Sequence, residues 1–245
     1  MNNNPFAGAA YLLRGLRILF KPGIRRYVVW PLIINTGLFS ALIVFGASRF
    51  NRMMEWILPE RLGWLEWLLW PLFAVGAALA VFFGFIMVAN LVGAPFNDRL
   101  SEAVEVHLQG RPPGTEGGLR GMVLEAADSV LSEIRKLVYW AGWSVPFLVL
   151  FVVPFVNVVA PLAWMGFTAW MLAVEYLDYP MARHGLPPAR QRELLRAHRL
   201  MSLGFGGAVM ILIMIPVLNF LAMPAAVAGA TAMWVERFSK NYSTV

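Results

Sequence analysis

The sequence contains no cysteine, only three histidines and few charged residues. Of its 245 residues, 14% are charged and 59% are hydrophobic, whereas a soluble domain is roughly 25% charged and 45–50% apolar. The absence of cysteine excludes disulfide scaffolds, thiolate metal sites and cysteine nucleophiles. The histidines His107, His184 and His198 are too few and too far apart to indicate a metal site. The composition excludes a disordered or fibrous protein and predicts an integral membrane protein.

The sequence also lacks the common catalytic signatures. No serine-hydrolase elbow, zinc-protease motif, Walker loop or dinucleotide fingerprint is present, although absent motifs alone do not exclude an enzyme. The residues of the sequence predict no catalytic residue, no metal and no cofactor, and we expect no enzymatic activity. Lysine and arginine number 20 against 14 acidic residues. In a membrane chain this excess orients the protein at anionic lipid, which predicts membrane lipids rather than nucleic acid as partners.

Four stretches without a charged residue divide the chain, at residues 27–48, 67–97, 137–174 and 200–235. About 20 apolar residues cross a bilayer, so the first two stretches predict transmembrane helices at residues 24–50 and 65–93. Leucines on one face and basic residues on the other predict an interfacial amphipathic helix at residues 7–21. Residues 98–136 are expected to form polar or amphipathic cytoplasmic helices.

The third and fourth stretches are too long for one crossing and short for two. Both contain Pro-x-x-Asn followed by a second proline, at Pro154 and at Pro216. We interpret them as a diverged internal repeat of two helical hairpins, at residues 137–175 and 188–240, the second with a preceding amphipathic helix. Two proline-kinked single crossings are the alternative.

Charge placement favours the hairpins. If each hairpin enters the membrane and returns, only three of the 20 lysines and arginines lie opposite the N-terminus, namely Arg49, Arg52 and Arg61. This asymmetry agrees with the positive-inside rule. The expected fold is one all-α integral membrane domain over residues 1–245, with two long transmembrane helices, two hemi-penetrating (re-entrant) hairpins and amphipathic interfacial helices.

The strongest local signal is Lys21-Pro22-Gly23-Ile24-Arg25-Arg26 at the start of the first span. Proline and glycine predict a turn, and the N–H groups of the helix that follows are free to bind an anion. Two consecutive arginines add forked donors that suit a tetrahedral oxyanion. The alternative is that these arginines anchor the span to lipid headgroups.

Four further residues are candidates for lining a pore. Asn35 and Asn90 place polar groups inside apolar spans, where facing a water-filled path or another helix limits their cost. Arg99 and Glu102 follow the second span at helical spacing. They could line a charged vestibule or simply solvate an amphipathic helix.

The ordered set of motifs resembles the bacterial sulfate permease family of CysZ, within the etoposide-induced protein superfamily. The resemblance covers nearly the whole chain and is carried by Gly15-Leu16-Arg17, Pro22 to Tyr27, Pro31 to Asn35, Ala94 to Asp98 and both Pro-x-x-Asn motifs. It implies a homo-oligomeric, multi-pass protein of the bacterial inner membrane that imports sulfate for cysteine biosynthesis. The family's Gly-Leu-Arg motif with a following arginine corresponds to Gly23, Ile24, Arg25 and Arg26, with isoleucine replacing leucine.

The leading hypothesis is therefore a channel-like sulfate permease that binds sulfate at Gly23, Ile24, Arg25 and Arg26. Two other classes stay open. A non-transporting membrane scaffold would use the arginines to hold lipid phosphates, and a membrane enzyme would act on a lipid phosphate with Glu102 as acid or base.

Overall fold

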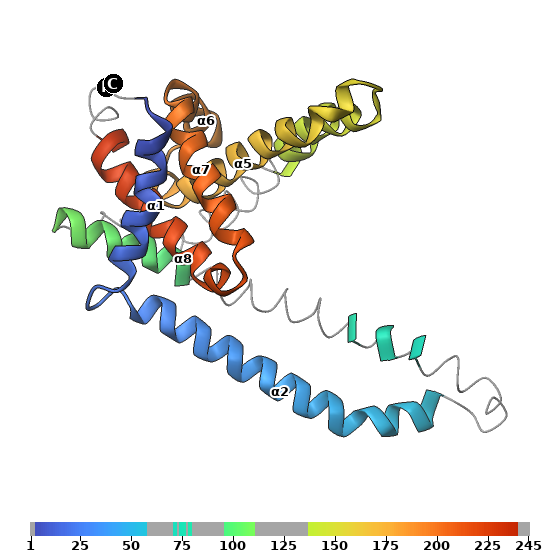
Figure 1. Ribbon diagram of the computed structural model, residues 1–245. Helices are drawn as coiled ribbons and strands as arrows, with labels where there is room; N and C mark the ends of the chain where they lie inside the picture. Colours follow the sequence, from blue (N-terminus) through green and yellow to red (C-terminus); the bar gives the residue numbers. More distant parts are fainter. Residues whose placement is uncertain are drawn as a thin grey trace. The chain divides into compact units, whose positions relative to one another are not determined.

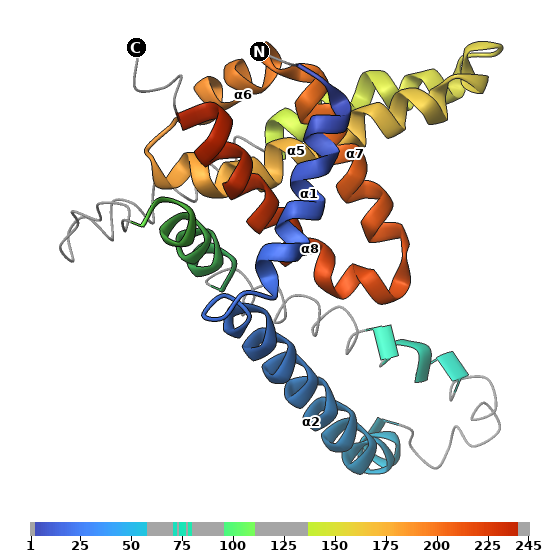
Figure 2. The ribbon, with the colours of Figure 1, turned by 60° about the vertical axis from the view of Figure 1, so that its left-hand side comes forward.

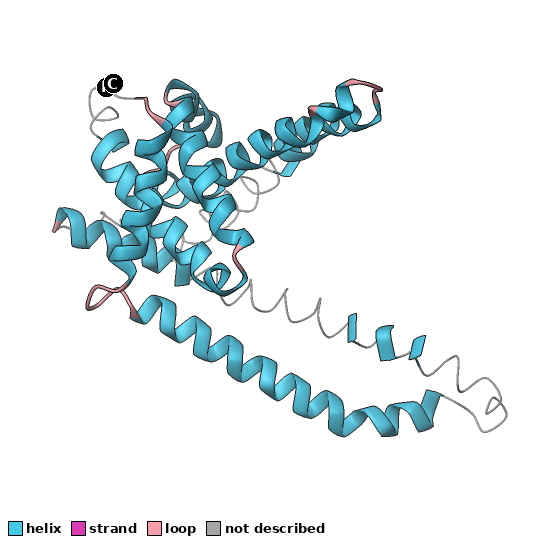
Figure 3. Cartoon of the chain, viewed as in Figure 1, coloured by secondary structure: helices cyan, strands magenta, loops and turns pink. Residues whose placement is uncertain are grey.

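The computed structural model describes residues 3–57, 71–72, 74–76, 78–79, 96–110 and 137–239. Every regular element in these ranges is a helix, so the all-helical prediction is confirmed (Figure 3). Asn90, most of the expected second span and residues 111–136 of the expected cytoplasmic helices lie outside the described residues. The chain forms two compact units, Met1–Arg25 with Asn97–Val245, and Arg26–Phe96.

The helices of the larger unit are labelled in Figure 1. They are α1 (Pro5–Leu19), α5 (Ala160–Arg183), α6 (Pro188–Ala197), α7 (Arg199–Met214) and α8 (Pro216–Met233), which a short π-helix (Trp234–Phe238) extends. Residues 96–109 and Leu137–Val152 are also helical.

Helix α1 packs against α7 and α8 and so forms part of the core of this unit (Figure 2). Asn4 caps it by accepting the Phe6 N–H at 2.9 Å, and Pro5 fills the first helical position, where no N–H is needed. Gly8 and Gly15 allow close approach, because a Cβ on either would lie within 2.2 Å of a backbone oxygen of α7 or α8. The expected apolar face therefore exists, but Leu12 and Leu19 are covered by protein.

The end of the chain supplies the apolar centre of the unit. Leu218–Phe238 is the one unbent helix among the described residues that is long and apolar enough to cross a membrane, and 61% of its most apolar window is buried. Helices α6 and α7 pass the same test only as a pair bent by 101°. Burial shows that the apolar character of Leu218–Phe238 is used in part for packing inside the protein.

Helix Leu137–Val152 and α5 form an antiparallel helical pair, which we call the first hairpin. The rings of Phe147 and Phe167 stack at 4.8 Å between centroids, and those of Phe151 and Trp164 meet edge-on at 6.2 Å. The chain turns between residues 153 and 159. Phe155 adopts a φ of +66° at this turn, and its side chain is 94% exposed.

Helices α7 and α8 form the second hairpin, and its break also falls at the repeated motif. Pro216 begins α8, since proline needs no hydrogen-bond acceptor at the first helical position. Asn157 lies in a 3₁₀ turn, whereas Asn219 is already helical and donates its N–H to the Ile215 carbonyl at 2.8 Å. The asparagine therefore forms the turn in the first hairpin only.

Helix α2 (Arg26–Ile57) belongs to the smaller unit. Its 32 residues correspond to about 48 Å at 1.5 Å per residue. It begins two residues after the expected start and ends seven residues after the expected end. Its first turns expose Val29, Trp30, Leu32 and Ile33, an apolar surface unsuited to water.

Candidate functional site

The loop between α1 and α2 folds around a left-handed glycine. Gly23 has a φ of +86°, a conformation that residues with a Cβ adopt only with strain. Two backbone N–H groups, those of Ile24 and Arg25, donate to the Lys21 carbonyl at 3.1 and 3.3 Å. The sequence Pro22-Gly23 therefore forms the expected turn, and α2 begins directly after it at Arg26.

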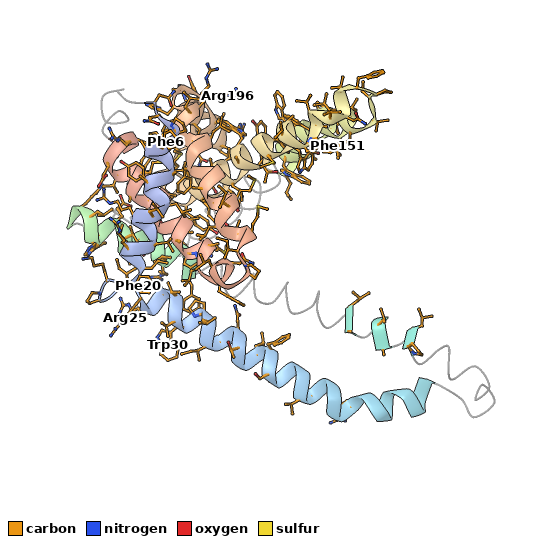
Figure 4. All side chains as sticks on the ribbon, in the orientation of Figure 1. Phe6, Phe20, Arg25, Trp30, Phe151 and Arg196 are labelled. Atoms are coloured by element: carbon orange, nitrogen blue, oxygen red, sulfur yellow. The ribbon has the colours of Figure 1, made fainter. Side chains whose placement is uncertain are left out.

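The side chains of this loop point in opposite senses. Ile24 is buried and anchors the loop, whereas Lys21, Arg25 and Arg26 are exposed. Figure 4 shows Arg25 projecting from the loop. Arg25 has no ion-pair partner within the described ranges. The guanidinium of Arg26 lies 4.9 Å from the centroid of the Tyr27 ring and donates to its hydroxyl at 3.0 Å.

This geometry is donor-rich, and no carboxylate of the described residues forms an ion pair with Arg25 or Arg26. Both guanidinium groups keep donors for an anion, because the contacts of Arg26 in the described part of the chain are with the neutral ring and hydroxyl of Tyr27. The first N–H groups of α2 have no acceptor within their own helix. The N–H of Ile24, a residue of the predicted sulfate site, donates to the Lys21 carbonyl, whereas the N–H of Gly23 makes no such bond among the described residues.

A second polar cluster joins residues 96–109 to the end of α5. The Arg183 side chain is only 8% exposed, and its Nη2 lies 2.6 Å from both Oδ1 and the backbone oxygen of Asp98. Its Nη1 lies 3.4 Å from Glu102 Oε2. Arg183 therefore holds the first turns of this helix against α5.

His184 extends the cluster by pairing with a buried acid. Its Nε2 lies 3.0 Å from Oε1 of Glu105, whose side chain is 1% exposed, and its Nδ1 lies 2.8 Å from the Pro180 carbonyl. With an acceptor at each ring nitrogen, the imidazole is best satisfied when doubly protonated. The hydrogen bond to Glu105 accordingly raises the pKa of His184 above its usual 6.5, against the opposing effect of burial.

The stability of the protein should depend on His184. Because its pKa is raised on folding, the stabilisation is fully present below pH 6.5 and is lost as pH rises through the folded pKa. We expect the melting temperature of the wild type to be a few degrees lower at pH 9 than at pH 6. In His184→Gln the melting temperature should change less with pH. The matched control is His198→Gln, since His198 contacts Leu194 and Phe238 and has no acidic partner among the described residues. If the melting temperature of His184→Gln depended on pH as strongly as that of the wild type, the His184–Glu105 pair would not be the cause of the dependence.

The structure places the predicted pore residues in different settings. Glu102 lies between Arg183 and Arg99, while the Arg99 side chain is 71% exposed and reaches Glu102 at 4.0 Å. Asn35 lies on α2, and its buried Oδ1 has no hydrogen-bond partner in the part of the chain that is described. Glu102 thus has a structural contact, whereas Asn35 keeps an unsatisfied acceptor.

Sequence reasoning missed the polar contacts made by residues far apart in the chain. It assigned no partner to Arg183, to Glu105 or to His184. A further contact joins α1 to the π-helix, where Glu236 pairs with Arg14 and accepts from the Tyr11 hydroxyl at 3.2 Å. No sequence motif marks such pairs, because each partner alone resembles a solvated charge. In the described ranges, no three histidine, aspartate or glutamate side chains are grouped to hold a metal ion.

Comparison with known proteins gives consistent matches. Residues 11–224 match the family described as Sulfate transporter CysZ/Etoposide-induced protein 2.4. Proteins named Sulfate transporter CysZ from Pseudomonas fluorescens (strain Pf0-1) and Pseudomonas paraeruginosa (strain PA7) are each 42% identical to this chain. The alignments cover 97% of both chains in the first case, and 94% of this chain and 95% of the relative in the second. The Pseudomonas syringae pv. tomato protein of that name is 38% identical over 94% of this chain and 92% of its own.

Proposed function

Because this chain belongs to the family of the sulfate transporter CysZ and etoposide-induced protein 2.4, we propose that it imports sulfate across the bacterial inner membrane for cysteine biosynthesis. The observation that carries this function is the identity of 38–42% to proteins named sulfate transporters, over nearly the full length of each chain. The resemblance read from the motifs is thereby confirmed at the level of the family.

Sulfate is proposed to bind at the loop before α2. Arg25 and Arg26 supply charged, forked donors, and Gly23 and the first turn of α2 supply N–H groups. Sulfate only accepts hydrogen bonds at neutral pH, so a site without a carboxylate favours it over protonated phosphate. Ile24 would add its N–H only if its bond to Lys21 opened. Exposure of the arginines keeps binding weak enough for release, as transport requires.

The proposed membrane layout has α2 and residues 65–93 as spans and both hairpins as partial insertions. Helix Leu137–Val152 and α7 have 16 residues each, or about 24 Å at 1.5 Å per residue, against a hydrocarbon core about 30 Å thick. After each of these two helices the chain reverses its direction, at residues 153–159 in the first hairpin and at Ile215 in the second. Exposed Phe155, Met214 and Phe220 near these turns suit lipid contact.

Cysteine labelling tests this layout, because the chain has no cysteine of its own. Asn157→Cys and Asn219→Cys are expected to resist a membrane-impermeant thiol reagent added on the side opposite the N-terminus. Arg61→Cys, between the end of α2 and residue 65 in the sequence, is the positive control and should react from that side. Rapid labelling of residue 157 or 219 there would indicate full crossings instead of hairpins.

The transport proposal includes three further assignments. Asn35 is a pore-lining candidate because its Oδ1 lacks a partner among described residues. Glu102 and the exposed Arg99 are candidates for a charged vestibule beside the cluster of Arg183. Assembly into a homo-oligomer would cover part of the apolar surface of α2.

Two other functions would give different experimental results. A scaffold would bind lipid phosphate through Arg25 without moving sulfate, and a lipid-phosphate enzyme would release a product that Glu102→Gln abolishes. The relatives are named as transporters, which favours a protein without a catalytic residue.

Uptake of labelled sulfate into proteoliposomes tests the function. We expect saturable uptake that excess unlabelled sulfate suppresses strongly and that chloride and phosphate suppress less. Uptake no faster than in empty liposomes, with folded protein, would contradict transport and favour the scaffold.

A further inference from the structure

An apolar groove runs along the base of the first hairpin and ends at two arginines. It encloses about 410 Å³ and is lined by Tyr139, Trp143, Phe147, Phe167, Arg196 and Arg199, among others. We call it the hairpin groove. Its aromatic wall comes from helix Leu137–Val152 and α5, and its arginines come from the end of α6 and the start of α7.

The basic end of the hairpin groove has no ion-pair partner in the described residues. Arg196 and Arg199 are both exposed, and neither forms an ion pair there. Arg192 adds a third positive charge, with its guanidinium 4.7 Å from the centroid of the Tyr139 ring. Arg190, by contrast, pairs with Glu193 at 3.1 Å on the same helix. Three arginines beside an apolar groove form a surface complementary to a ligand with an anionic head and an apolar tail.

Near the arginines, the aromatic wall consists of amphipathic Trp and Tyr side chains, as is typical of residues at a membrane interface. Closer to the turn of the hairpin, the exposed side chains are those of a lipid-facing surface. The Trp170 Nε1 donates to the Tyr139 hydroxyl at 3.3 Å, and Trp143 is 49% exposed. Such amphipathic rings collect at the level of lipid headgroups. Towards the turn the hairpin exposes large apolar side chains, including Phe151 and Phe155, and Figure 4 shows Phe151 well along the hairpin from Arg196.

The length of the hairpin groove fits one leaflet of a bilayer. Tyr139 and Phe147 are eight residues apart on one helix, or about 12 Å, which is less than half of the hydrocarbon thickness of about 30 Å. A phosphate held at Arg196 and Arg199 would therefore place an acyl chain along Trp143 and Phe147 within the same leaflet.

We infer that the hairpin groove is a binding site for an anionic phospholipid, with the phosphate at Arg196 and Arg199 and one acyl chain against the aromatic wall. The guanidinium groups donate to phosphate oxygens, and the stacked rings of Phe147 and Phe167 offer apolar surface to the chain. A second negative headgroup charge is not needed, but a zwitterionic headgroup would bring a cation close to three arginines. The inference rests on the chain lying in a membrane and not on passage of sulfate.

Native mass spectrometry of the full chain in detergent tests the inference with phosphatidylglycerol, phosphatidylcholine and inorganic phosphate. We expect phosphatidylglycerol to occupy the wild type at least five-fold more than phosphatidylcholine at equal concentration. Arg196→Gln/Arg199→Gln should remove this preference, and Trp143→Ser should lower occupancy by both lipids. The matched control is Arg49→Gln/Arg190→Gln, which removes the same charge outside the groove and should leave the preference unchanged.

Three results would overturn the inference. The first is an unchanged lipid preference in the folded Arg196→Gln/Arg199→Gln variant. The second is displacement of phosphatidylglycerol by equimolar inorganic phosphate, which would indicate an anion site without a place for the acyl chain. The third is a disulfide-linked dimer of Trp143→Cys in liposomes, which would show a second copy of the chain against the groove. None depends on sulfate uptake, so failure here is separate from failure of the transport proposal.

Discussion

Replacing Arg25 and Arg26 together by glutamine should abolish saturable sulfate uptake. Each arginine can make charge-assisted hydrogen bonds to the anion, and a hydrogen bond to a charged group contributes roughly 1.5–3 kcal/mol. Loss of two such bonds, about 3–6 kcal/mol, corresponds to at least a 100-fold weaker affinity. The fold should survive, because Arg25 and Arg26 are both exposed and, among the described residues, the side-chain contact of Arg26 is with its neighbour Tyr27.

The measurement is the initial rate of labelled sulfate uptake into proteoliposomes over a range of sulfate concentrations. Arg49→Gln/Arg190→Gln removes the same charge from two exposed positions outside the loop and should transport as the wild type does. The single variants Arg25→Gln and Arg26→Gln should show how much each arginine contributes, and we expect the half-saturating sulfate concentration to rise in each. Wild-type uptake in the double variant would place sulfate entry elsewhere in the protein.

Adding one methyl group at Gly206 should lower the melting temperature by roughly 5–10 °C, whereas the same change at Gly207 should not. A Cβ on Gly206 would lie 1.8 Å from the Ala169 carbonyl oxygen and 2.7 Å from its carbon, both backbone atoms of α5. Helices α5 and α7 would have to separate, and overpacking of this kind costs about 1–3 kcal/mol or somewhat more. In a chain of this size each kcal/mol shifts the melting temperature by about 2–4 °C.

Gly207 is the matched control, because it is the next residue of the same helix and a Cβ there would meet nothing within 4 Å. Gly207→Ala should be neutral or stabilise by about 0.5–1 kcal/mol, since glycine in a helix is less favourable than alanine. Thermal unfolding of both variants in one detergent, followed by intrinsic tryptophan fluorescence, provides the comparison. Equal melting temperatures for the two variants would show that α5 and α7 are not in close contact at Gly206.

Much of the local structure could be predicted because it depends on neighbouring residues. Pro22 and Gly23 predict the turn before α2, and the structure has Gly23 at positive φ there. Pro154 and Pro216 predict breaks in long apolar stretches, and the helices end next to both. The family could be read from the ordered motifs, and the match over residues 11–224 agrees.

The contacts between distant segments could not be predicted from periodicity. A pattern of apolar residues shows that α1 has a face to bury, but lipid and protein both satisfy that face. The structure resolves the choice for Leu12 and Leu19, because glycines bring the backbones of α7 and α8 against α1. Hydropathy reflects the free energy of removing a side chain from water, and it does not distinguish burial in lipid from burial in the protein interior.

The sequence by itself determined that the chain is an apolar, helical membrane protein, where its helices break and which arginines lie at the start of α2. Only the tertiary structure decided which charges meet. Arg183 and Asp98 are 85 positions apart, and His184 finds a buried acid at Glu105. A charged residue in a sequence resembles any solvated charge until folding removes it from water, where it becomes stable only beside its partner.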